Sequence, residues 1–528
     1  MTISATCSRR RSMPGCLSAI FLVLGGSMAV AQTIGPVLHV KADAAGANNG
    51  SCWQDAFTRL EEALDAAYYA QGTVTQIWVA GAVYKPDGGM GSRAAAFVLV
   101  DGVSLYGGFA GHETSLTQRN PATNITILSG DIGTPGVITD NCYSVVVGFD
   151  MISSPVLDGF TIRDGNAGHN TSYLEGGGVL IYDGSPTIRN CRIINNAANR
   201  GGGLYCNGAA LITGCTFENN SATTLGGGAY LENGARLVDC RLTGNSAGSG
   251  GGVHAEADSS VSQCTIDGNT AAVGAGVHAL ASTVANCKIT GNLSVQSSPM
   301  ALSYGGGIYA DGSTICNCLI ALNRVMRFSG TGHGGGIACD NAGVTIRNCT
   351  IADNNPGGVS TVRLASPPVI SSSIIWGNTG GAVTREAPTD GAAAPICYSD
   401  FDTVEGTWTG AGNINDLPHL SADYHLQPGS PCIDAGDPAY AAAKQEADLD
   451  LEYRVAGGRV DIGSDESNSP RIADINLDRK VNIFDLQRMA LSWNKIQGQT
   501  GYDPACDLSG DNRVNIFDLQ ILAKYWNR

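Results

Sequence analysis

A short pattern that returns about every 24 residues constrains the fold of this 528-residue chain more than any other feature. Between residues 175 and 372, a Gly triplet leads into a few strand-forming residues, a turn, and then Cys-x-apolar-x-x-Asn. Successive Cys residues are 24, 25, 24, 23, 31 and 31 positions apart. They are Cys191, Cys215, Cys240, Cys264, Cys287, Cys318 and Cys349, and each has an Asn five positions later, at Asn196, Asn220, Asn245, Asn269, Asn292, Asn323 and Asn354.

This repeat predicts an all-β, parallel solenoid. A unit of two or three short strands cannot bury its own apolar face, so each copy must pair its strands with those of the next copy. The 71 Gly residues and the charged content of only 15% also argue against a helical protein. Residues at matching positions of consecutive coils are then about 4.8 Å apart.

The alternation of side chains along a strand predicts which repeat positions face inward. The Cys and the apolar residue two positions later share one face, so we expect the Cys ladder to be buried. Free thiols are favoured because in-register strands rarely suit disulfide geometry, although disulfides are the alternative. We expect each Asn amide to bond the Asn above and below it and to adopt a left-handed turn conformation.

Two outward columns are candidates for binding an extended substrate. Five ring side chains occupy the second position after the Gly turn: Tyr205, Tyr230, His254, His278 and Tyr309. They can stack sugar rings or, alternatively, only stiffen the sheet. Arg192, Arg241 and Lys288 follow the Cys on alternate coils, where they can grip an acidic polysaccharide or simply be solvated.

No catalytic constellation emerges from the sequence of the repeats, so the catalytic residues stay unknown at this stage. A lyase of acidic glycans needs a metal-binding carboxylate cluster beside a base, and a hydrolase needs closely set carboxylates. The acidic residues of the coils do not recur in one column on neighbouring coils. They are Glu175, Asp183, Glu218, Glu232, Asp239, Glu256, Asp258 and Asp267.

The repeats resemble the secreted right-handed parallel β-helix proteins of the pectate-lyase-like class. The opening "VLHVKADAAGANNGSCWQDAFTRLEEALDAA" resembles their N-terminal entry, with a capping helix expected over residues 53–67. "SIIWGN", "DYHLQPGSPCIDAGDP" and "RVDIGSDE" resemble their closing module. The resemblance implies a polysaccharide lyase, an O-glycosyl hydrolase or a polysaccharide-binding protein; a non-catalytic adhesin or structural β-helix protein is the alternative.

Two near-copies, "DINLDRKVNIFDLQRMALSWN" and "DLSGDNRVNIFDLQILAKYWN", follow at an offset of 33 residues. Oxygen-bearing residues recur in both at loop positions 1, 3, 5, 9 and 12, which is the arrangement that wraps Ca²⁺ in EF-hand loops. The predicted ligands, including the position-7 carbonyls of Lys480 and Arg513, are Asp474, Asn476, Asp478, Lys480, Asn482 and Asp485, then Asp507, Ser509, Asp511, Arg513, Asn515 and Asp518. Position 6 is Arg479 or Asn512, where Gly is usual.

This pair of loops resembles a type I dockerin, a small helical module. The resemblance implies two bound Ca²⁺ ions and a cohesin-like partner, with a self-contained cell-surface tether as the alternative. Exposed apolar residues at matching positions of the copies are the expected partner contacts: Ile483, Phe484, Ile516 and Phe517.

The first residues predict export. Three Arg precede a short apolar stretch that ends in Ala29-Val30-Ala31, as in a secretory signal peptide. No other apolar stretch is long enough to span a membrane once the signal is cleaved. The formal net charge of −16 argues against nucleic acid as a partner.

We therefore predict an extracellular or cell-surface protein of four parts. Residues 1–31 are the signal peptide, and residues 32–150 hold the cap and first coils. Residues 151–467 form the right-handed β-helix with its closing module, and residues 470–528 form the dockerin-like domain.

Overall fold

The structure, a computed structural model, describes most of the chain after the predicted signal peptide, which lies outside the described residues. The described residues are 35–168, 175–296, 303–327, 333–341, 343–362, 367–385, 394–404, 408–442, 446–455, 458–467, 473–476, 478 and 480–526.

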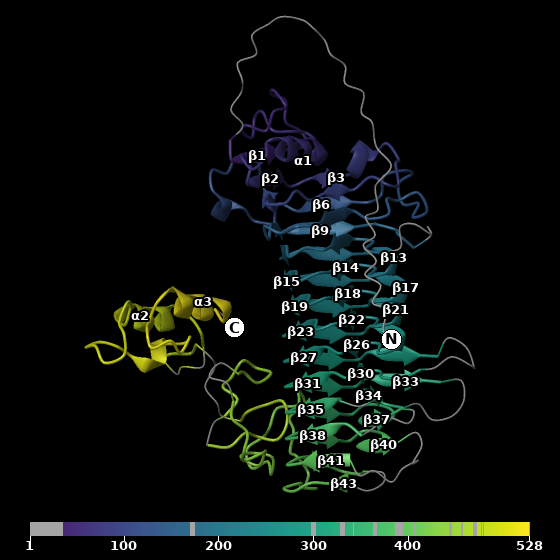
Figure 1. The fold of residues 1–528 in the computed structure, drawn as a ribbon, viewed down its shortest axis with the longest axis vertical. Coiled ribbons are helices and arrows are strands. Elements are labelled where there is room, and N and C mark those ends of the chain that lie inside the picture. The colour runs from purple at the N-terminus through teal and green to yellow at the C-terminus, as the bar shows by residue number, and fades with distance from the viewer. Residues whose placement is uncertain are drawn as a thin grey trace, which may run out of the picture.

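The repeats stack as the rungs of one parallel β-solenoid, which runs along the long axis of the molecule (Figure 1). Within the described residues, the strands form four sheets, and every pairing between neighbouring coils is parallel. The first three sheets extend along the whole stack, whereas the fourth sheet joins only the middle coils. The predicted all-β parallel solenoid is confirmed, with one more strand per coil than expected in the middle of the stack.

The strand bounds follow the order of each sheet. The first sheet contains β1 (Val37–Val40), β2 (Gln76–Ala80), β5 (Ser104–Phe109), β8 (Val156–Asp158), β11 (Thr187–Arg189), β15 (Leu211–Thr213), β19 (Arg236–Val238), β23 (Ser260–Ser262), β27 (Thr283–Ala285), β31 (Thr314–Cys316), β35 (Thr345–Arg347), β38 (Val369–Ser371), β41 (Ala394–Cys397) and β43 (Trp408–Thr409). The second contains β4 (Phe97–Val98), β7 (Val146–Phe149), β10 (Val179–Tyr182), β14 (Leu204–Asn207), β18 (Ala229–Glu232), β22 (Val253–Ala255), β26 (Val277–Leu280), β30 (Ile308–Asp311), β34 (Ile337–Asp340), β37 (Val359–Thr361) and β40 (Val383–Arg385).

The third sheet contains β3 (Val83–Tyr84), β6 (Thr126–Ser129), β9 (Phe160–Arg163), β12 (Arg192–Ile194), β16 (Thr216–Glu218), β20 (Arg241–Thr243), β24 (Thr265–Asp267), β28 (Lys288–Thr290), β32 (Leu319–Ala321), β36 (Thr350–Ala352), β39 (Ile374–Trp376) and β42 (Asp400–Phe401). The fourth contains β13 (Ala197–Arg200), β17 (Ser221–Leu225), β21 (Ser246–Ser249), β25 (Thr270–Val273), β29 (Leu293–Val295) and β33 (Arg324–Met326). Short 3₁₀ turns cover Pro86–Gly89, Leu116–Gln118 and Pro504–Cys506.

Single left-handed residues make the corners between the short strands. In every coil of the Cys ladder, the residue before the Cys and the residue four positions after it have a positive φ angle, for example Asn190 (52°) and Asn195 (56°). The predicted ladder Asn lies one position later and is not among the left-handed residues, so that part of the prediction was wrong. Asn, Asp and Gly at these corners accept the left-handed region at low cost.

The Gly triplet allows one coil to approach the next closely. Gly226, the first of its triplet, has a φ of 66°. A Cβ on Gly227 would lie 2.4 Å from the carbonyl oxygen of Ser246 in the next coil. A side chain at this position would therefore separate the coils.

The inward columns form one continuous apolar core. The seven ladder Cys and the apolar residues two positions later are all buried, with exposed fractions of 0–3%. All described Cys residues are free thiols, as the sequence favoured. The thiols occupy the core as small apolar groups. Each thiol also donates a weak hydrogen bond to a nearby backbone carbonyl, as Cys240 does to Val238.

A buried ladder of Asn amides joins the coils, as predicted. The Asn245 Oδ1 accepts from both the backbone N–H and the side-chain amide of Asn220, each at 3.0 Å. Its Nδ2 donates to the Phe217 carbonyl at 3.0 Å. The same bonds repeat without interruption from Asn196 to Asn378.

The first coils are capped by helix α1 (Leu60–Tyr69), which packs its Leu60, Ala63 and Leu64 into the core. The helix begins seven residues later than predicted. Phe57 instead pairs with β1 through hydrogen bonds to His39 and Lys41, so the preceding residues are held in turns.

The C-terminal module contains helices α2 (Ile483–Leu491) and α3 (Ile516–Lys524), which lie apart from the stacked rungs (Figure 1). Met489 and Leu522 are buried between them. Ala447 and Tyr453 of the segment that follows the coils pack against the same small core.

The Asn ladder gives a testable prediction about stability. Replacing Asn245 by Ala leaves the Asn220 donors and the Phe217 carbonyl buried without their partner, so Asn245→Ala should lower the free energy of unfolding by about 2–4 kcal/mol. The change is measured from the urea midpoint by circular dichroism. Thr265→Ala, on the outer face of β24, is the control and should change the midpoint little. Equal midpoints for the two variants would contradict a supporting role for the ladder.

Candidate functional site

Three carboxylates converge in the first C-terminal loop. Ligand oxygens of Asp474, Asp478 and Asp485 all lie within 4.8 Å of one another. Asp474 and Asp485 are buried, with exposed fractions of 4% and 0%. Asp485 is fixed by the backbone amides of Asn476 (3.0 Å) and Asn482 (2.8 Å), so both of its oxygens face a closed loop.

The second loop repeats this geometry. Asp507, Asp511 and Asp518 also bring their ligand oxygens within 4.8 Å of one another. Asp518 is fully buried and accepts from the backbone amides of Ser509 and Asn515, each at 2.7 Å. The two near-copies of the sequence therefore fold into two equivalent acidic loops.

The position-9 Asn residues also start the helices. The Asn482 Oδ1 accepts from the Phe484 amide at 2.9 Å, and the Asn515 Oδ1 accepts from the Phe517 amide at 2.8 Å. Each is an N-cap that places its helix directly after the loop. The position-7 residues contact the loop carboxylates through their backbone amides. The Lys480 N–H donates to the Asp478 carboxylate, and the Arg513 N–H donates to the Asp511 carboxylate.

The donor set of these loops fits a hard divalent cation. Three converging carboxylates, two of them buried, repel one another unless a cation lies between them. Oxygen donors at these loop positions are those that Ca²⁺ prefers. Asn512 adopts a φ of 64° at position 6, so it takes the left-handed conformation that Gly usually supplies. Arg479, its counterpart, lies outside the described residues.

The predicted partner contacts are solvent-exposed in both copies. Ile483 and Phe484 are 48% and 59% exposed, and Ile516 and Phe517 are 51% and 58% exposed. Each helix start therefore presents two adjacent exposed apolar side chains next to its acidic loop. The two pairs match in sequence and exposure.

On the solenoid, the predicted ring column is in register but is not open to solvent. Tyr205, Tyr230, His254, His278 and Tyr309 occupy matching positions of consecutive strands of the second sheet. Tyr205 and Tyr230 stack at 4.9 Å, and Tyr230 and His254 stack at 5.0 Å. Tyr205, Tyr230, His254 and Tyr309 are only 2–7% exposed, so the ring faces contact one another. This placement favours the stiffening role, and sugar stacking by these rings stays a prediction.

The rings instead hold a set of carboxylates. The Tyr205 hydroxyl donates to Glu232 at 3.3 Å, and the Tyr230 hydroxyl donates to Glu256. The expectation that these acidic residues are scattered was wrong for this pair. Glu256 follows β22, whose Ala255 pairs with Leu231, so Glu232 and Glu256 lie on neighbouring rungs.

The Tyr–Glu contacts were missed because each joins two neighbouring coils at two different strand positions. In each case, a hydroxyl at the second position of one strand reaches the fourth position of the next, as Tyr309 also does with Asp340. A search of single columns compares only equal positions. An alignment of the coils that also compares positions two apart contains the signal.

Electrostatics keep Glu256 ionised. The His254 Nε2 lies 3.4 Å from the Glu256 carboxylate, and this contact together with the Tyr230 hydroxyl lowers the pKa of Glu256 to about 2. On the next ring, desolvation by burial lowers the pKa of His278 to about 3 and keeps this imidazole neutral. Glu256 is 27% exposed and Glu232 is half-buried, so both carboxylates reach solvent.

The predicted basic column is exposed and in register. Arg192, Arg241 and Lys288 lie at the outer start of β12, β20 and β28, and a Thr lies on each rung between them. The cations are therefore about 9.6 Å apart, twice the rung spacing. Arg192 also pairs with Glu218 at 3.4 Å.

Within the described part of the chain, none of the helices has the length and apolar content needed to cross a membrane.

A coiled stack of parallel strands followed by a pair of acidic loop–helix units defines the class of this protein. Residues 117–271 and 273–390, just over half of the chain, match the family model "Right handed beta helix region", and residues 472–527 match "Dockerin type I domain". The chain belongs to the right-handed β-helix family and carries a C-terminal type I dockerin, a domain that binds calcium.

Two solved structures are similar to the chain. One is described as "Crystal structure of pectate lyase Pel9A", with 14% identity over 82% of this chain and 96% of that chain and a TM-score of 0.43. The other is the pectin methylesterase from Aspergillus niger in deglycosylated form, with 13% identity over 66% and 84% and a TM-score of 0.24. A comparison with curated proteins found no match.

The acidic loops predict a loss of calcium binding on a conservative substitution. Asp518→Asn keeps the shape of the side chain but removes a buried charge from the second loop, so the number of Ca²⁺ ions bound per chain should fall by one. Isothermal titration calorimetry measures this number. Asp65→Asn, on the exposed face of α1, is the control, and a parent-like titration of Asp518→Asn would show that this loop does not bind the ion.

The lowered pKa of Glu256 predicts a pH-dependent stability. The folded state favours the ionised form, so its stabilisation is complete above pH 4.5 and is lost as the pH falls towards about 2. Glu256→Gln should therefore lower the unfolding midpoint at pH 6, and its difference from the parent should shrink at about pH 3. Glu218→Gln, on the third sheet, is the control. A Glu256→Gln difference that is constant with pH would contradict this assignment.

Proposed function

We propose that this chain is an extracellular β-helix protein that acts on or binds a polysaccharide, and that its calcium-loaded dockerin attaches it to a cohesin-like partner. The single observation that carries the proposal is the pair of acidic loops, each with three converging carboxylates, appended to a β-helix. Dockerins attach proteins to larger assemblies, and the long side of a β-helix offers room for a polymer.

One feature of the coils supports an acidic polysaccharide as the ligand. The exposed cations at Arg192, Arg241 and Lys288 form a straight row on an otherwise acidic chain. A straight row of charges at a constant spacing matches an extended polymer with regularly spaced carboxylates.

If the protein is an enzyme, Glu232 and Glu256 are its best candidate catalytic residues. They are partly exposed carboxyl groups on neighbouring rungs, and glycoside hydrolysis requires two closely set carboxyl groups. Glu232, as the protonated carboxylic acid, gives its proton to the glycosidic oxygen, while the ionised Glu256 acts on the anomeric carbon or on a water. Tyr205 and His254 then position the two carboxylates.

The alternative function is a non-catalytic adhesin or structural spacer. Groups of side chains that can hold a metal, among the residues described, lie only after the coils, in the segment from His425 to Asp518. A metal-dependent lyase of acidic glycans requires such a group on an outer face of the coils. This observation favours the hydrolase or the adhesin over the lyase.

The proposal is tested with the mature chain, with and without Ca²⁺, on pectate, alginate and neutral glucans. We expect retention on pectate or alginate, and loss of most of this retention when Arg192, Arg241 and Lys288 are all changed to Ala. Thr216→Ala with Thr265→Ala, in the same column, is the matched control. Retention that is equal in both variants would exclude the basic row.

Reaction products separate the enzyme from the adhesin. New reducing ends without ultraviolet absorbance, abolished by Glu256→Gln but not by Glu218→Gln, indicate hydrolysis at the ring-held carboxylates. Absorbance of unsaturated uronates indicates a lyase instead. A folded chain that binds glycans but releases no product is an adhesin. Recombinant cohesin domains, added with Ca²⁺ or with a chelator, test the tether, and the absence of Ca²⁺-dependent binding to any of them would overturn it.

A further inference from the structure

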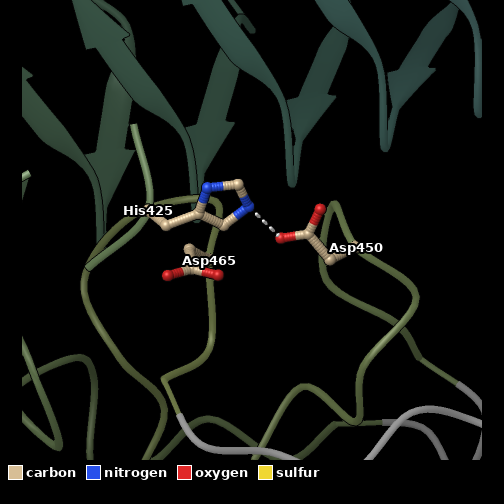
Figure 2. A group of neighbouring side chains, drawn as sticks. All are labelled: His425, Asp450 and Asp465. Atoms are coloured by element: carbon tan, nitrogen blue, oxygen red, sulfur yellow. Dashed lines mark hydrogen bonds and ion pairs between the residues drawn. The ribbon is translucent and has the colours of Figure 1, made fainter. Parts of the chain in front are cut away.

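The segment that closes the solenoid brings together one imidazole and two carboxylates from three separate turns. Figure 2 shows Asp450 and Asp465 close to the ring of His425. Ligand atoms of the three side chains all lie within 4.8 Å of one another, and the His425 Nε2 lies 2.6 Å from the Asp450 Oδ2. This cluster is separate from the calcium loops and from the outer columns of the coils.

Asp465 is the buried member of the cluster. The residue is 8% exposed, and its Oδ2 accepts from the Leu426 amide at 2.7 Å. No other hydrogen bond or ion pair reaches this carboxylate from the part of the chain that the structure describes. Its ligand oxygen lies within 4.8 Å of those of His425 and Asp450, and two carboxylates this close together are stabilised by a positive group between them.

The other ring nitrogen of His425 is held by a further carboxylate. The Nδ1 lies 3.1 Å from the Asp423 Oδ2. In metal sites, a ligating His usually donates its second ring N–H to a carboxylate, which fixes the ring and leaves the other nitrogen free to bind the ion. With the proton on Nδ1, the lone pair of Nε2 faces the Asp450 carboxylate, so an ion bound there would replace the direct contact between Nε2 and Asp450.

We propose that His425, Asp450 and Asp465 bind one divalent transition metal ion, with Zn²⁺ as its representative. One nitrogen and two carboxylate oxygens suit Zn²⁺, whereas the all-oxygen loops of the dockerin suit Ca²⁺. His425 and Asp450 are 39% and 32% exposed, so a remaining coordination position is open to water.

Such an ion would join turns that few regular hydrogen bonds hold together. His425 lies next to the bridge between Leu420 and Leu426, and Asp450 lies in the turn between the bridged residues Ala447 and Tyr453. Asp465 follows Gly463 and Ser464, which are bonded to Ser372 and Thr350 of the last coils. The ion therefore fixes the closing segment on the end of the solenoid.

The competing explanation is a protonated His425 that pairs with Asp423 and Asp450 and binds no metal. Both ring nitrogens then donate to carboxylates, and the imidazolium supplies the positive charge beside Asp465. The two explanations differ in one measurable quantity, the binding of Zn²⁺ by the folded chain in the presence of Ca²⁺.

The test titrates ZnCl₂ into the mature chain in excess Ca²⁺, by calorimetry and by thermal unfolding. We expect one Zn²⁺ site per chain and a rise of several degrees in the unfolding midpoint of the solenoid. Asp465→Asn keeps an acceptor for the Leu426 amide but removes the charge, so it should weaken Zn²⁺ binding at least about tenfold. His425→Ala should abolish binding.

Two controls locate the signal. His112→Ala removes an exposed His near the N-terminus and should bind Zn²⁺ as the parent does. Asp485→Asn with Asp518→Asn disables the calcium loops and should also leave Zn²⁺ binding intact. The proposal is overturned if the folded chain binds no Zn²⁺, or if His425→Ala and Asp465→Asn bind it as tightly as the parent.

Discussion

The vertical register between coils is the constraint on which every outer and inner column depends. The buried Asn amides enforce it, because each Oδ1 accepts two bonds from the Asn of the preceding coil, and each Nδ2 donates to a carbonyl of that coil and to the Asn Oδ1 of the following coil. A shift of one residue would break all of these bonds and turn the apolar face outward. Charged and aromatic side chains at equal positions must therefore stack, so their alignment follows from the core and does not by itself indicate function.

This dependence explains how much of the fold could be predicted. The seven Cys and seven Asn fix the coil length and the inward face, and the parallel solenoid with buried free thiols follows from them. The corners could not be assigned as easily, because the left-handed positions are filled by Asn, Asp, Gly, Gln and even Leu322. The Asn of the ladder resembles a turn residue in composition, but it is constrained by its side-chain bonds and not by its φ angle.

The candidate sites divide in the same way. The calcium loops are local, so the spacing of their oxygen donors along the chain was sufficient to predict which carboxylates converge. The Tyr230–Glu256 contact joins residues 26 positions apart that occupy different repeat positions. The cluster at His425 depends on turns that carry no repeat at all, and Asp465 reaches it only because residues 463 and 464 are fixed to the last coils. Sequence patterns find sites made by repetition or by one loop, and they miss sites made by docking.

In a stack of similar coils, a distinct site can form only where the side chains of one coil differ from those of its neighbours. The Asn ladder and the Cys column run through the coils unchanged, whereas a pair of half-exposed carboxylates on neighbouring rungs, each held by a ring hydroxyl, occurs at Glu232 and Glu256. Tyr309 repeats the contact with Asp340, but that carboxylate is only 2% exposed. A polymer lying along the basic row meets the same spacing at every step, so binding alone would not select one bond. In the proposed function, any selection of a bond would therefore have to come from such a local break in the periodicity.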